Sequence, residues 1–470
     1  MPIRWNPREH VLLARYAAKW LLIAAPLAIG IGAAVAVFLW ALDGVTRVRW
    51  NHPWLLYGLP LAGIFIGGMY QWLGQSVEGG NNLLMEQIHE PGGGVPARMA
   101  PLVLIGTLLT HLFGGSAGRE GTAVQMGGSM ASSYSRGLGR WFRWSPADVR
   151  TLLMVGIAGG FGAVFGTPLT GAVFALEVLA IGRMNYESVL PCLIAAIVGD
   201  RACTLISNRF GIHHTQYDLS VLGRSGVPLD GQFSGVLVGK IAIAAVAFGL
   251  ASVVFAEAAH GLSWGFKKLI RRPMLRPVVG GCLVILLAHL VGFDYLGLGV
   301  SADPHHPGQV SILSSFHAGG ARPFSWGWKI LFTAVTISSG FKGGEVTPLF
   351  FIGAALGNAM AHLLGAPVEL FAALGFVAVF AGATNTPLAC TIMGIELFGG
   401  GAGELLRGSF VVYLAVACFL AYLFSGHSGI YLSQRIGMPK ESGLSSGEAL
   451  RDTRALKPGV RELLRRARGR

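Results

Sequence analysis

A charged pentapeptide, Gly118-Arg119-Glu120-Gly121-Thr122, lies between two of the more apolar stretches of the chain. An ionised carboxylate at bilayer depth costs roughly 2.5–3.5 kcal/mol, so it persists only where it is paired or used. Gly118 and Gly121 let the backbone approach a ligand closely, and a helix that begins at Gly121 would direct unpaired N–H groups at an anion. We therefore interpret the pentapeptide as an anion site with an acidic group, Glu120, beside it.

Two neighbouring charges of opposite sign also have a simpler explanation. Arg119 and Glu120 would neutralise each other in a buried turn, and the pentapeptide alone leaves both explanations open. The residues just before it, 114–118, match the GxSxG pattern of serine hydrolases, with His111 close by. That pattern requires a strand, a turn and a helix around the serine. The apolar sequence here lacks that order, so we do not expect an enzyme.

Two elements of the sequence occur twice in the same order. Residues 118–122 (GREGT) align with 343–347 (GGEVT), and 167–169 (TPL) followed by Glu177 align with 386–388 (TPL) followed by Glu396. Both pairs are about 220 residues apart, which indicates a duplication. Interrupted apolar segments at matching places in two halves are typical of transporters that bind their substrate between repeats. We predict membrane repeats of inverted topology at residues 1–232 and 233–438, followed by a basic cytoplasmic tail at 439–470.

The composition is that of an all-α polytopic membrane protein. Hydrophobic residues make up 53% of the 470 residues and charged residues only 13%, about half the share usual in soluble proteins. The mean hydropathy is +0.58. The net charge of +13 does not indicate nucleic-acid binding, because the Lys and Arg residues concentrate at the termini and in short connecting segments. The chain is expected to lie in a lipid bilayer.

The elements that must position these residues are apolar segments of unequal length. We expect spans at residues 20–41, 54–73, 236–255 and 278–291. Many of the remaining segments are shorter than the roughly 20 residues needed to cross a bilayer, which implies tilted and half-spanning helices. They are residues 101–114, 122–134, 152–165, 169–181, 189–206, 330–337, 349–364, 371–380, 388–398 and 410–424.

Two local patterns refine this prediction. The polar, glycine-rich residues 78–82 interrupt the apolar sequence, and a break at membrane depth is tolerated only where it is buried in protein or lines a cavity. Ser145-Pro146-Ala147-Asp148 has a capping residue followed by Pro, which predicts the start of a helix.

Basic residues indicate the orientation. Residues 1–19, the loop 136–150, the connector 267–276 and the C-terminal tail are rich in Lys and Arg, and such segments favour the cytoplasm. Both termini are therefore expected to be cytoplasmic. Arg47 and Arg49 follow the first span and are the clear exception to this pattern.

Cysteine and histidine indicate neither a disulfide framework nor a metal site. The five cysteines are far apart, most within apolar runs, and we expect buried thiols. The pairs His213-His214 and His305-His306 lie in polar loops without further ligand spacing, so solvated histidines are expected. No cofactor is indicated.

The sequence resembles the CLC family of chloride channels and anion/proton antiporters. The resemblance rests on GREG at residues 118–121, a GxxxxP element at 343–348 and Tyr431 in the last segment. It implies a homodimer with an inverted repeat and one pore per subunit. It also implies anions bound at helix N-termini formed around Gly118, Arg119 and Gly121. Glu120 would then be the gating glutamate, which occupies an anion site when ionised and leaves it when protonated.

Departures from the chloride-transporting pattern point to a branch of that family. Asn81 stands where those transporters have an anion-coordinating serine, and Val346 replaces the phenylalanine of a GxFxP motif. Val178 stands where many antiporters have a second, proton-transferring glutamate. Together with Thr122 after GREG and Glu345 in GGEVTP, these departures resemble the fluoride-exporting branch.

The chemistry of fluoride agrees with this interpretation. Fluoride is small and strongly hydrated, so its dehydration requires dense hydrogen-bond donors, which the Asn81 amide and the Thr347 and Tyr431 hydroxyls could supply. On spacing alone, Tyr431 could equally be an interfacial anchor. A low dielectric favours the neutral form of a carboxyl group, so we expect Glu120 to load protons. Glu345, its counterpart in the repeat, is expected to be its proton partner.

Some of these residues also have purely structural explanations. Asn81 and Asn82 are common turn formers. Glu177 and Glu396 are expected at helix ends that reach water.

We thus predict a transporter that exports fluoride in exchange for protons across a bacterial inner membrane. A chloride-type CLC antiporter and a passive anion channel are the alternatives.

Overall fold

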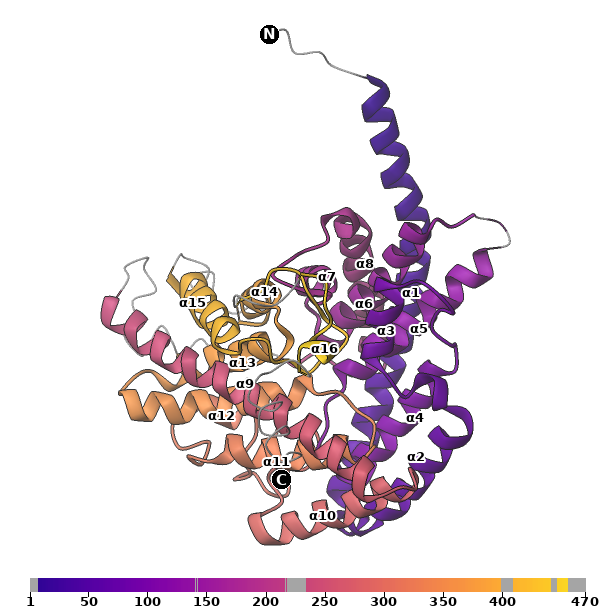
Figure 1. The fold of residues 1–470 in the computed structure, drawn as a ribbon. Helices are drawn as coiled ribbons and strands as arrows, with labels where there is room; N and C mark the ends of the chain where they lie inside the picture. Colours follow the sequence, from indigo (N-terminus) through magenta and orange to yellow (C-terminus); the bar gives the residue numbers. More distant parts are fainter. Residues whose placement is uncertain are drawn as a thin grey trace, which may run out of the picture.

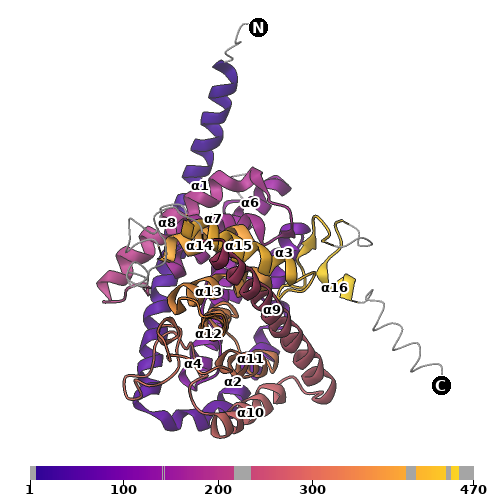
Figure 2. The same cartoon turned by 90° about the vertical axis from the view of Figure 1, so that its left-hand side faces the viewer.

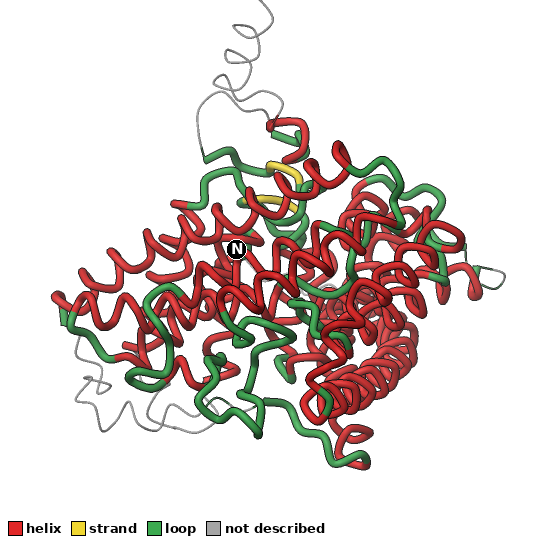
Figure 3. The backbone as a smooth tube through the Cα atoms, turned by 90° about the horizontal axis from the view of Figure 1, so that it is seen from below, coloured by secondary structure: helices red, strands yellow, loops and turns green. Residues whose placement is uncertain are grey.

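The structure is a computed structural model that describes residues 7–139, 141, 143–215, 217, 234–398, 409–440 and 446–454. These residues are almost entirely helical (Figures 1 and 3). The expected boundary between repeats, at residues 232 and 233, lies outside the described residues, as does most of the basic tail.

The first half of the chain contains eight α-helices within the described residues. They are α1 (Pro7–Asn51), α2 (Leu59–Leu73), α3 (Asn81–His89), α4 (Met99–Leu112), α5 (Glu120–Leu138), α6 (Pro146–Phe165), α7 (Pro168–Glu177) and α8 (Val189–Arg209). Short 3-10 helices η1 (Pro53–Gly58), η2 (Gln75–Val77) and η3 (Tyr186–Ser188) and the strand β1 (Ala180–Ile181) connect them.

The second half continues the helical pattern in the described part of the chain. Its elements are α9 (Gly235–Leu269), α10 (Leu275–Val291), η5 (Ser314–Phe316), α11 (Ser325–Ser338), α12 (Val346–Leu364), α13 (Val368–Thr384), α14 (Pro387–Phe398), α15 (Ser409–Phe424), β2 (Arg435–Ile436) and α16 (Leu450–Arg454). The lengths of matching helices support the duplication, because α4 and α11 both have 14 residues and α5 and α12 both have 19.

The expected mixture of long and short helices is confirmed. Six helices within the described residues are long and apolar enough to cross a membrane. By contrast, α7 has 10 residues and α14 has 12, which at 1.5 Å per residue corresponds to about 15–18 Å, roughly half of a bilayer core. Short helices of this kind end inside the protein, where their termini can form a site.

Two helices are longer than the apolar runs predicted. The first helix, α1, has 45 residues instead of the 22 of the apolar run 20–41, because Ala, Leu, Arg and Lys before Trp20 are good helix formers. Its N-terminal part projects beyond the other helices (Figures 1 and 2). The helix α9 continues to Leu269, so Lys267 and Lys268 lie in its last turn rather than in a connector, where positive charge suits the helix dipole.

Helix starts were predicted with mixed success. The start of α6 is confirmed: Ser145 and Asp148 form a reciprocal capping box, with Pro146 as the first helical residue. Helix α5 begins at Glu120 instead of Gly121, with Arg119 as its N-cap residue. The predicted break at 78–82 is shorter than expected, because residue 81 already begins α3 after Gly80, whose φ of +54° requires glycine.

The prediction of buried thiols is confirmed for four of the five cysteines. Cys192, Cys203, Cys390 and Cys418 are buried, and all five thiols are free. Cys282 is exposed on α10, because it falls on the outer side of that helix, and the expectation of a buried thiol there was wrong.

The half-spanning helices α7 and α14 cap each other. The Glu177 carboxylate at the end of α7 accepts the backbone N–H groups of Leu388 (3.1 Å) and Ala389 (2.8 Å) at the start of α14. The Glu396 carboxylate at the end of α14 accepts those of Leu169 and Thr170, both at 2.8 Å. The expectation that these glutamates reach water was wrong for Glu177, which is buried, whereas Glu396 is partly exposed. Each of them binds N–H groups that the other helix leaves unpaired.

The hydrophobic core joins the two halves. Most elements of the first half lie on the right of Figure 1 and most of the second half on the left and below, with α10 packed against α2. Between them, Phe161 of α6 stacks on Phe174 of α7 at 4.3 Å between ring centroids, and Phe350 of α12 stacks on Phe376 of α13 at 3.9 Å. Phe380 of α13 contacts both pairs, at 6.3 Å from Phe161 and 5.3 Å from Phe350. This aromatic cluster fixes the position of α6 and α7 relative to α12 and α13.

A second connection between the halves follows α15. The two-residue strands β1 and β2 pair in parallel, with Ala180 opposite Arg435 and Ile181 opposite Ile436 (Figure 3). Next to β2, the Gln434 side chain donates to the carbonyls of Val178 and Thr384, both at 2.9 Å. The segment that carries Tyr431 is thereby held against the ends of α7 and α13.

The contribution of the reciprocal caps to the stability of the fold can be tested by mutation. Glu177→Ala and Glu396→Ala each leave two backbone N–H groups without their acceptor, at a cost of about 1–3 kcal/mol for each buried donor. Each variant should lower the midpoint of thermal denaturation in detergent, whereas Glu187→Ala, at an exposed surface position, should leave it unchanged. Unchanged midpoints in both cap variants would show that the caps add no stability.

Candidate functional site

The Glu120 carboxylate is buried, with 1% of the residue exposed, and is held mainly by α12. The Thr347 hydroxyl donates to it, 2.6 Å from Oε1 and 2.7 Å from Oε2. The backbone N–H groups of Thr347 and Arg119 also donate to Oε2, each at 3.1 Å. A carboxylate from one repeat is therefore bound by a hydroxyl and an N–H group at the helix N-terminus of the other repeat.

Arg119 contributes less to this arrangement than charge alone would predict. Its Nε lies 3.5 Å from Glu120 Oε1 as an ion pair, but this buried nitrogen forms no hydrogen bond within the described residues. The simple explanation, in which Arg119 and Glu120 only neutralise each other, therefore accounts for part of the contact. The shorter and better directed bonds come from Thr347.

Glycines allow the two helix N-termini to meet. Gly118 and Gly344 form an antiparallel backbone bridge, with both N–H to carbonyl distances at 2.6 Å. A Cβ atom on Gly344 would lie 2.8 Å from the backbone nitrogen of Gly121, and one on Gly118 would lie 2.9 Å from Glu120 Oε2. The glycines of both motifs are thus needed for the close approach of the two loops.

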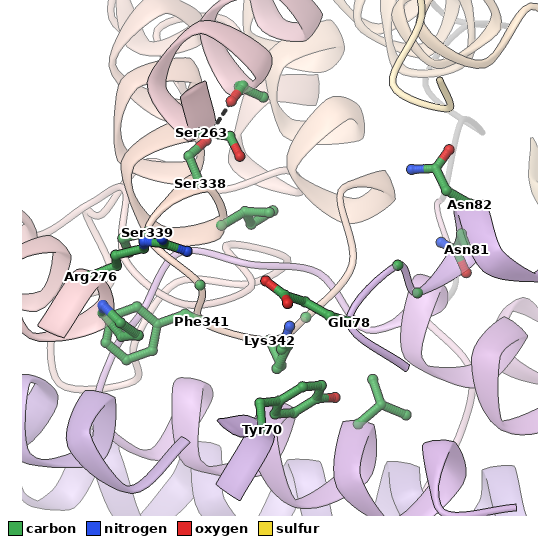
Figure 4. Close-up of a pocket in the computed structure, with 18 of the residues that line it drawn as sticks. Tyr70, Glu78, Asn81, Asn82, Ser263, Arg276, Ser338, Ser339, Phe341 and Lys342 are labelled. Carbon is green, nitrogen blue, oxygen red and sulfur yellow. Dashed lines mark hydrogen bonds between the residues drawn. The ribbon is translucent and has the colours of Figure 1, made fainter. Parts of the chain in front are cut away.

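A cavity of about 800 Å³ lies on one side of this junction (Figure 4). Asn81, Glu345 and Tyr431 line it, so three of the predicted site residues face one space. The Asn81 Oδ1 atom is buried without a hydrogen-bond partner within the described residues, and its Nδ2 atom would lie 3.3 Å from a Cβ atom on Gly121. Asn81 is therefore close to the N-terminus of α5 and can donate into the cavity.

Glu345 differs from Glu120 in its contacts. It is the N-cap residue of α12, but its side chain makes no cap hydrogen bond. In the described part of the chain its carboxylate takes part in no ion pair. The structure does not join Glu345 to Glu120 by a hydrogen bond, since Glu120 is bound by Thr347 instead. The expected proton exchange between the two acids is thus not seen as a direct contact.

A second cavity, of about 180 Å³, is lined by Arg119 and His111 on the other side of the junction. The larger cavity is lined by Tyr70, near the end of α2, and by Pro273, just before α10. The smaller cavity is lined by Trp50, before the start of α2, and by Asp294, after the end of α10. The two cavities therefore lie at opposite ends of these helices. Glu120 lines neither of them, but its neighbour Arg119 lines the smaller cavity, and Glu345, two residues before Thr347, lines the larger one.

The remaining predicted residues have mainly structural contacts. Val346 is 2% exposed in the core, so only its backbone can contribute to an anion site. The Thr122 hydroxyl is 2.7 Å from that of Thr107. Asn82 accepts the backbone N–H of Ser433 at 3.0 Å and so links α3 to the segment after Tyr431.

Some charged residues near the site were missed by the sequence analysis. Figure 4 shows the Lys342 and Glu78 side chains directed toward each other over the ring of Tyr70, whose centroid is 3.9 Å from Lys342 Nζ. Lys329 is fully buried in α11, and its Nζ donates to the carbonyls of Tyr295 (3.1 Å) and Gly297 (2.9 Å). A lone lysine within an apolar segment is itself a signal of function, and that signal could have identified both lysines.

The serine hydrolase arrangement is not formed. The Ser116 hydroxyl is 2.9 Å from that of Thr333, and both ring nitrogens of His111 contact carbonyl oxygens, at 2.8 Å from Thr107 and 3.0 Å from Ala117. The histidine is therefore directed away from the serine. Within the described residues no three His, Cys, Asp or Glu side chains are grouped as metal ligands.

Comparison with known proteins assigns the chain to a family. Residues 62–426 match the family described as "Voltage gated chloride channel". The chain belongs to this family, the CLC family. It is 46% identical over 439 residues to the "Chloride/fluoride channel protein" of Pseudomonas syringae pv. tomato, a match that covers 92% of this chain and 90% of the relative. It is also 28% identical over 318 residues to the "H(+)/Cl(-) exchange transporter ClcA" of Yersinia pestis, covering 64% of this chain and 61% of that protein.

Solved structures of CLC proteins have the same fold. A crystal structure of a CLC-type fluoride/proton antiporter matches with a TM-score of 0.78 and 33% identity, covering 89% of this chain and 98% of that chain. A slow cyanobacterial Cl⁻/H⁺ antiporter matches with a TM-score of 0.68 at 20% identity, covering 87% and 94%. The predicted CLC-type helical fold is thus confirmed, and the family is one of channels and transporters.

The Glu120–Thr347 contact can be tested as a barrier to anions. Thr347→Val removes the hydroxyl donor but keeps the shape of the side chain, and a hydrogen bond to a charged group is worth about 1.5–3 kcal/mol. Glu120 should then leave its position more often, and anion leak across proteoliposomes at zero membrane potential should increase. Thr347→Ser retains the hydroxyl and should resemble the unaltered protein. Equal leak in all three proteins would contradict the role of this contact as a barrier.

Proposed function

We propose that this protein is a secondary active transporter that exports fluoride in exchange for protons. The observation that carries the proposal is the Glu120 carboxylate, bound by Thr347 and by backbone N–H groups between two cavities. The donors that hold a carboxylate oxygen can equally hold a small, strongly hydrogen-bonding anion. The names of the chloride/fluoride relative and of the fluoride/proton antiporter structure support the same activity.

Competition at one site would couple the two ions. An ionised Glu120 occupies the donors at the N-termini of α5 and α12, whose dipoles favour negative charge. When Glu120 takes up a proton, it loses most of its attraction for these donors, and an anion can replace it. One binding site then carries either the anion or the ionised carboxylate, so that movement of fluoride requires protonation of Glu120.

The proposed anion path continues into the larger cavity. Asn81 and Tyr431 would supply further donors there, and both line the cavity. Lys267, Arg276 and Lys342 also line it and make its surface attractive to anions. Dense donors favour fluoride, because it holds its water more strongly than chloride does. A chloride-type antiporter remains the alternative function, since the same donors can bind either halide.

Glu345 is proposed to carry the proton between Glu120 and the larger cavity. It lies two residues before Thr347, lines the cavity and has no side-chain cap bond. Such a carboxylate can rotate between Glu120 and water. It would replace the proton-transferring glutamate, whose place Val178 takes.

The proposed assembly and orientation follow from the family and from charge. We infer a homodimer in a bacterial inner membrane, with both termini cytoplasmic and inverted repeats at residues 1–232 and 233–438. The bacterial relatives and the basic segments 136–150 and 267–276 support this arrangement. Lys267 and Arg276 line the larger cavity, so that cavity would open to the cytoplasm and the smaller one to the outside.

The decisive experiment measures efflux from proteoliposomes loaded with equal fluoride and chloride, with ion-selective electrodes and an external pH electrode. Fluoride efflux should far exceed chloride efflux, with protons moving inward against their gradient. Equal efflux of both anions would identify a chloride-type antiporter instead. Fluoride efflux without proton movement would identify a channel.

Glu120→Gln tests the gate in the same assay. The amide has nearly the same shape but cannot exchange a proton, so proton uptake coupled to fluoride efflux should be abolished. Anion movement should then either stop or become passive. Proton-coupled exchange that persists in Glu120→Gln would refute the gating role.

Glu345→Gln tests the proposed proton carrier separately. Proton uptake per fluoride exported should fall, because the carboxylate that faces the larger cavity no longer accepts a proton. Glu369→Gln, in the first turn of α13 and outside both cavities, is the matched control and should exchange ions as the unaltered protein does. Unchanged coupling in Glu345→Gln would count against the assignment.

A further inference from the structure

The smaller cavity contains an unusual concentration of unpartnered nitrogen atoms. Within the described residues, only a few buried side-chain polar atoms lack a hydrogen-bond partner. Three of them, Arg49 Nε, Arg119 Nε and His214 Nε2, belong to residues that line this one cavity of about 180 Å³. Buried polar groups nearly always have partners, so a group of unpartnered nitrogens calls for an explanation.

Arg49 is one of the two residues, with Arg47, that the charge pattern of the chain could not explain. It lies in the last turn of α1 but is partly buried, whereas Arg47, two residues earlier, is exposed and pairs with Asp43 at 2.6 Å. A Cβ atom on Gly114 would lie only 2.7 Å from Arg49 Nε. Gly114 has a φ of +81°. Glycine is therefore needed there both to adopt the turn conformation and to leave room for the guanidinium group of Arg49. Arg49 thus packs against the loop that leads to Arg119.

Other positive charge is fixed behind the wall of the same cavity. Lys329 donates to the carbonyls of Tyr295 and Gly297, and Gly297 lines the cavity. These bonds orient the loop and place an ammonium group next to the space. Lys329 itself is fully buried, so its charge is poorly screened by water.

The acidic groups around the cavity are already engaged. Asp43 is paired with Arg47, and Asp294 lies 3.4 Å from Arg322 as an ion pair. Asp303, on the loop after α10, accepts the backbone N–H of His305 at 2.9 Å. Within the described residues Arg49 forms no ion pair, and Arg119 has only the 3.5 Å contact with Glu120. An uncompensated guanidinium is costly in a poorly hydrated space, and an anion between two of them removes much of that cost.

We propose that this cavity is a second anion-binding site, in which Arg49, Arg119 and His214 hold a monovalent inorganic anion such as fluoride. Its volume suits a halide with some of its water and is too small for large organic anions. The inference deepens the proposed function, because the site would receive the anion that leaves the Glu120 position. Arg119 touches both places and would transfer the anion from one to the other.

Isothermal titration calorimetry of the full-length protein in detergent tests the site without requiring transport. Sodium fluoride is titrated into the unaltered protein, Arg49→Met, Arg49→Lys and Arg209→Met. Arg209 ends α8, is exposed and does not line the cavity, so its variant removes the same charge as a matched control. Arg49→Met keeps the aliphatic stem but should weaken fluoride binding about tenfold, as expected for the loss of a charge-assisted contact.

The two remaining variants separate charge from geometry and folding. Arg49→Lys keeps the charge but not the planar donor, so its affinity should lie between those of the unaltered protein and Arg49→Met. Arg209→Met should bind as the unaltered protein does. If Arg49→Met does not elute as a folded protein in size-exclusion chromatography, Arg49→Lys alone decides the question. An unchanged isotherm in the folded Arg49 variants would overturn the proposal.

The outcome is distinguishable from failure of the proposed function. Fluoride binding that depends on Arg49, in a protein that shows no fluoride efflux from proteoliposomes, would support the site and reject the transporter. Proton-coupled fluoride efflux, in a protein whose binding isotherm does not change in Arg49→Met or Arg49→Lys, would support the transporter and reject the site.

Discussion

The hydrogen bonds between Glu120 and Thr347 are the interaction on which the rest of the arrangement depends. The carboxylate and its donors come from different repeats, so the contact exists only if the N-termini of α5 and α12 reach the same point. Gly118 and Gly344 permit this approach through their backbone bridge. Both helix dipoles then favour negative charge at one buried position. A large, mainly apolar scaffold thereby holds a single acid where its protonation changes the contacts between the two halves.

The reciprocal caps of α7 and α14 use the same chemistry for a different purpose. Glu177 and Glu396 also accept N–H groups from the other repeat. Neither of them lines a cavity, in contrast to the Glu120 region, which has a cavity on each side. We infer that a position between two cavities, rather than the type of hydrogen bond, distinguishes Glu120 from these structural carboxylates, since Arg119 and Glu345 beside it line one cavity each. We infer that duplication supplied acids at both places and that their different surroundings allow different roles.

The sequence predicts local features well and long-range contacts poorly. The membrane class, the short helices, the start of α6 and the importance of Glu120 follow from composition, spacing and capping residues. The partners of Glu177 could not be predicted, because they lie 211 and 212 positions away, and no local pattern specifies which helix end is its neighbour. Arg49 was an exception to the charge pattern for the same reason: its environment is formed by α1 together with the loop at Gly114, which are far apart in the sequence.

Glu120 and Glu345 occupy equivalent places in the two repeats, yet their surroundings differ. Glu120 is bound by Thr347 and by the Arg119 N–H group, whereas Glu345 lines the larger cavity without a side-chain cap bond. Two acids with identical surroundings would give a proton no preferred route between them. Because only one of them is exposed to a cavity lined by Lys342 and Asn81, we infer that the proton and the anion meet on that side of the barrier. We infer that this difference between the surroundings of Glu120 and Glu345 makes exchange through a single site possible.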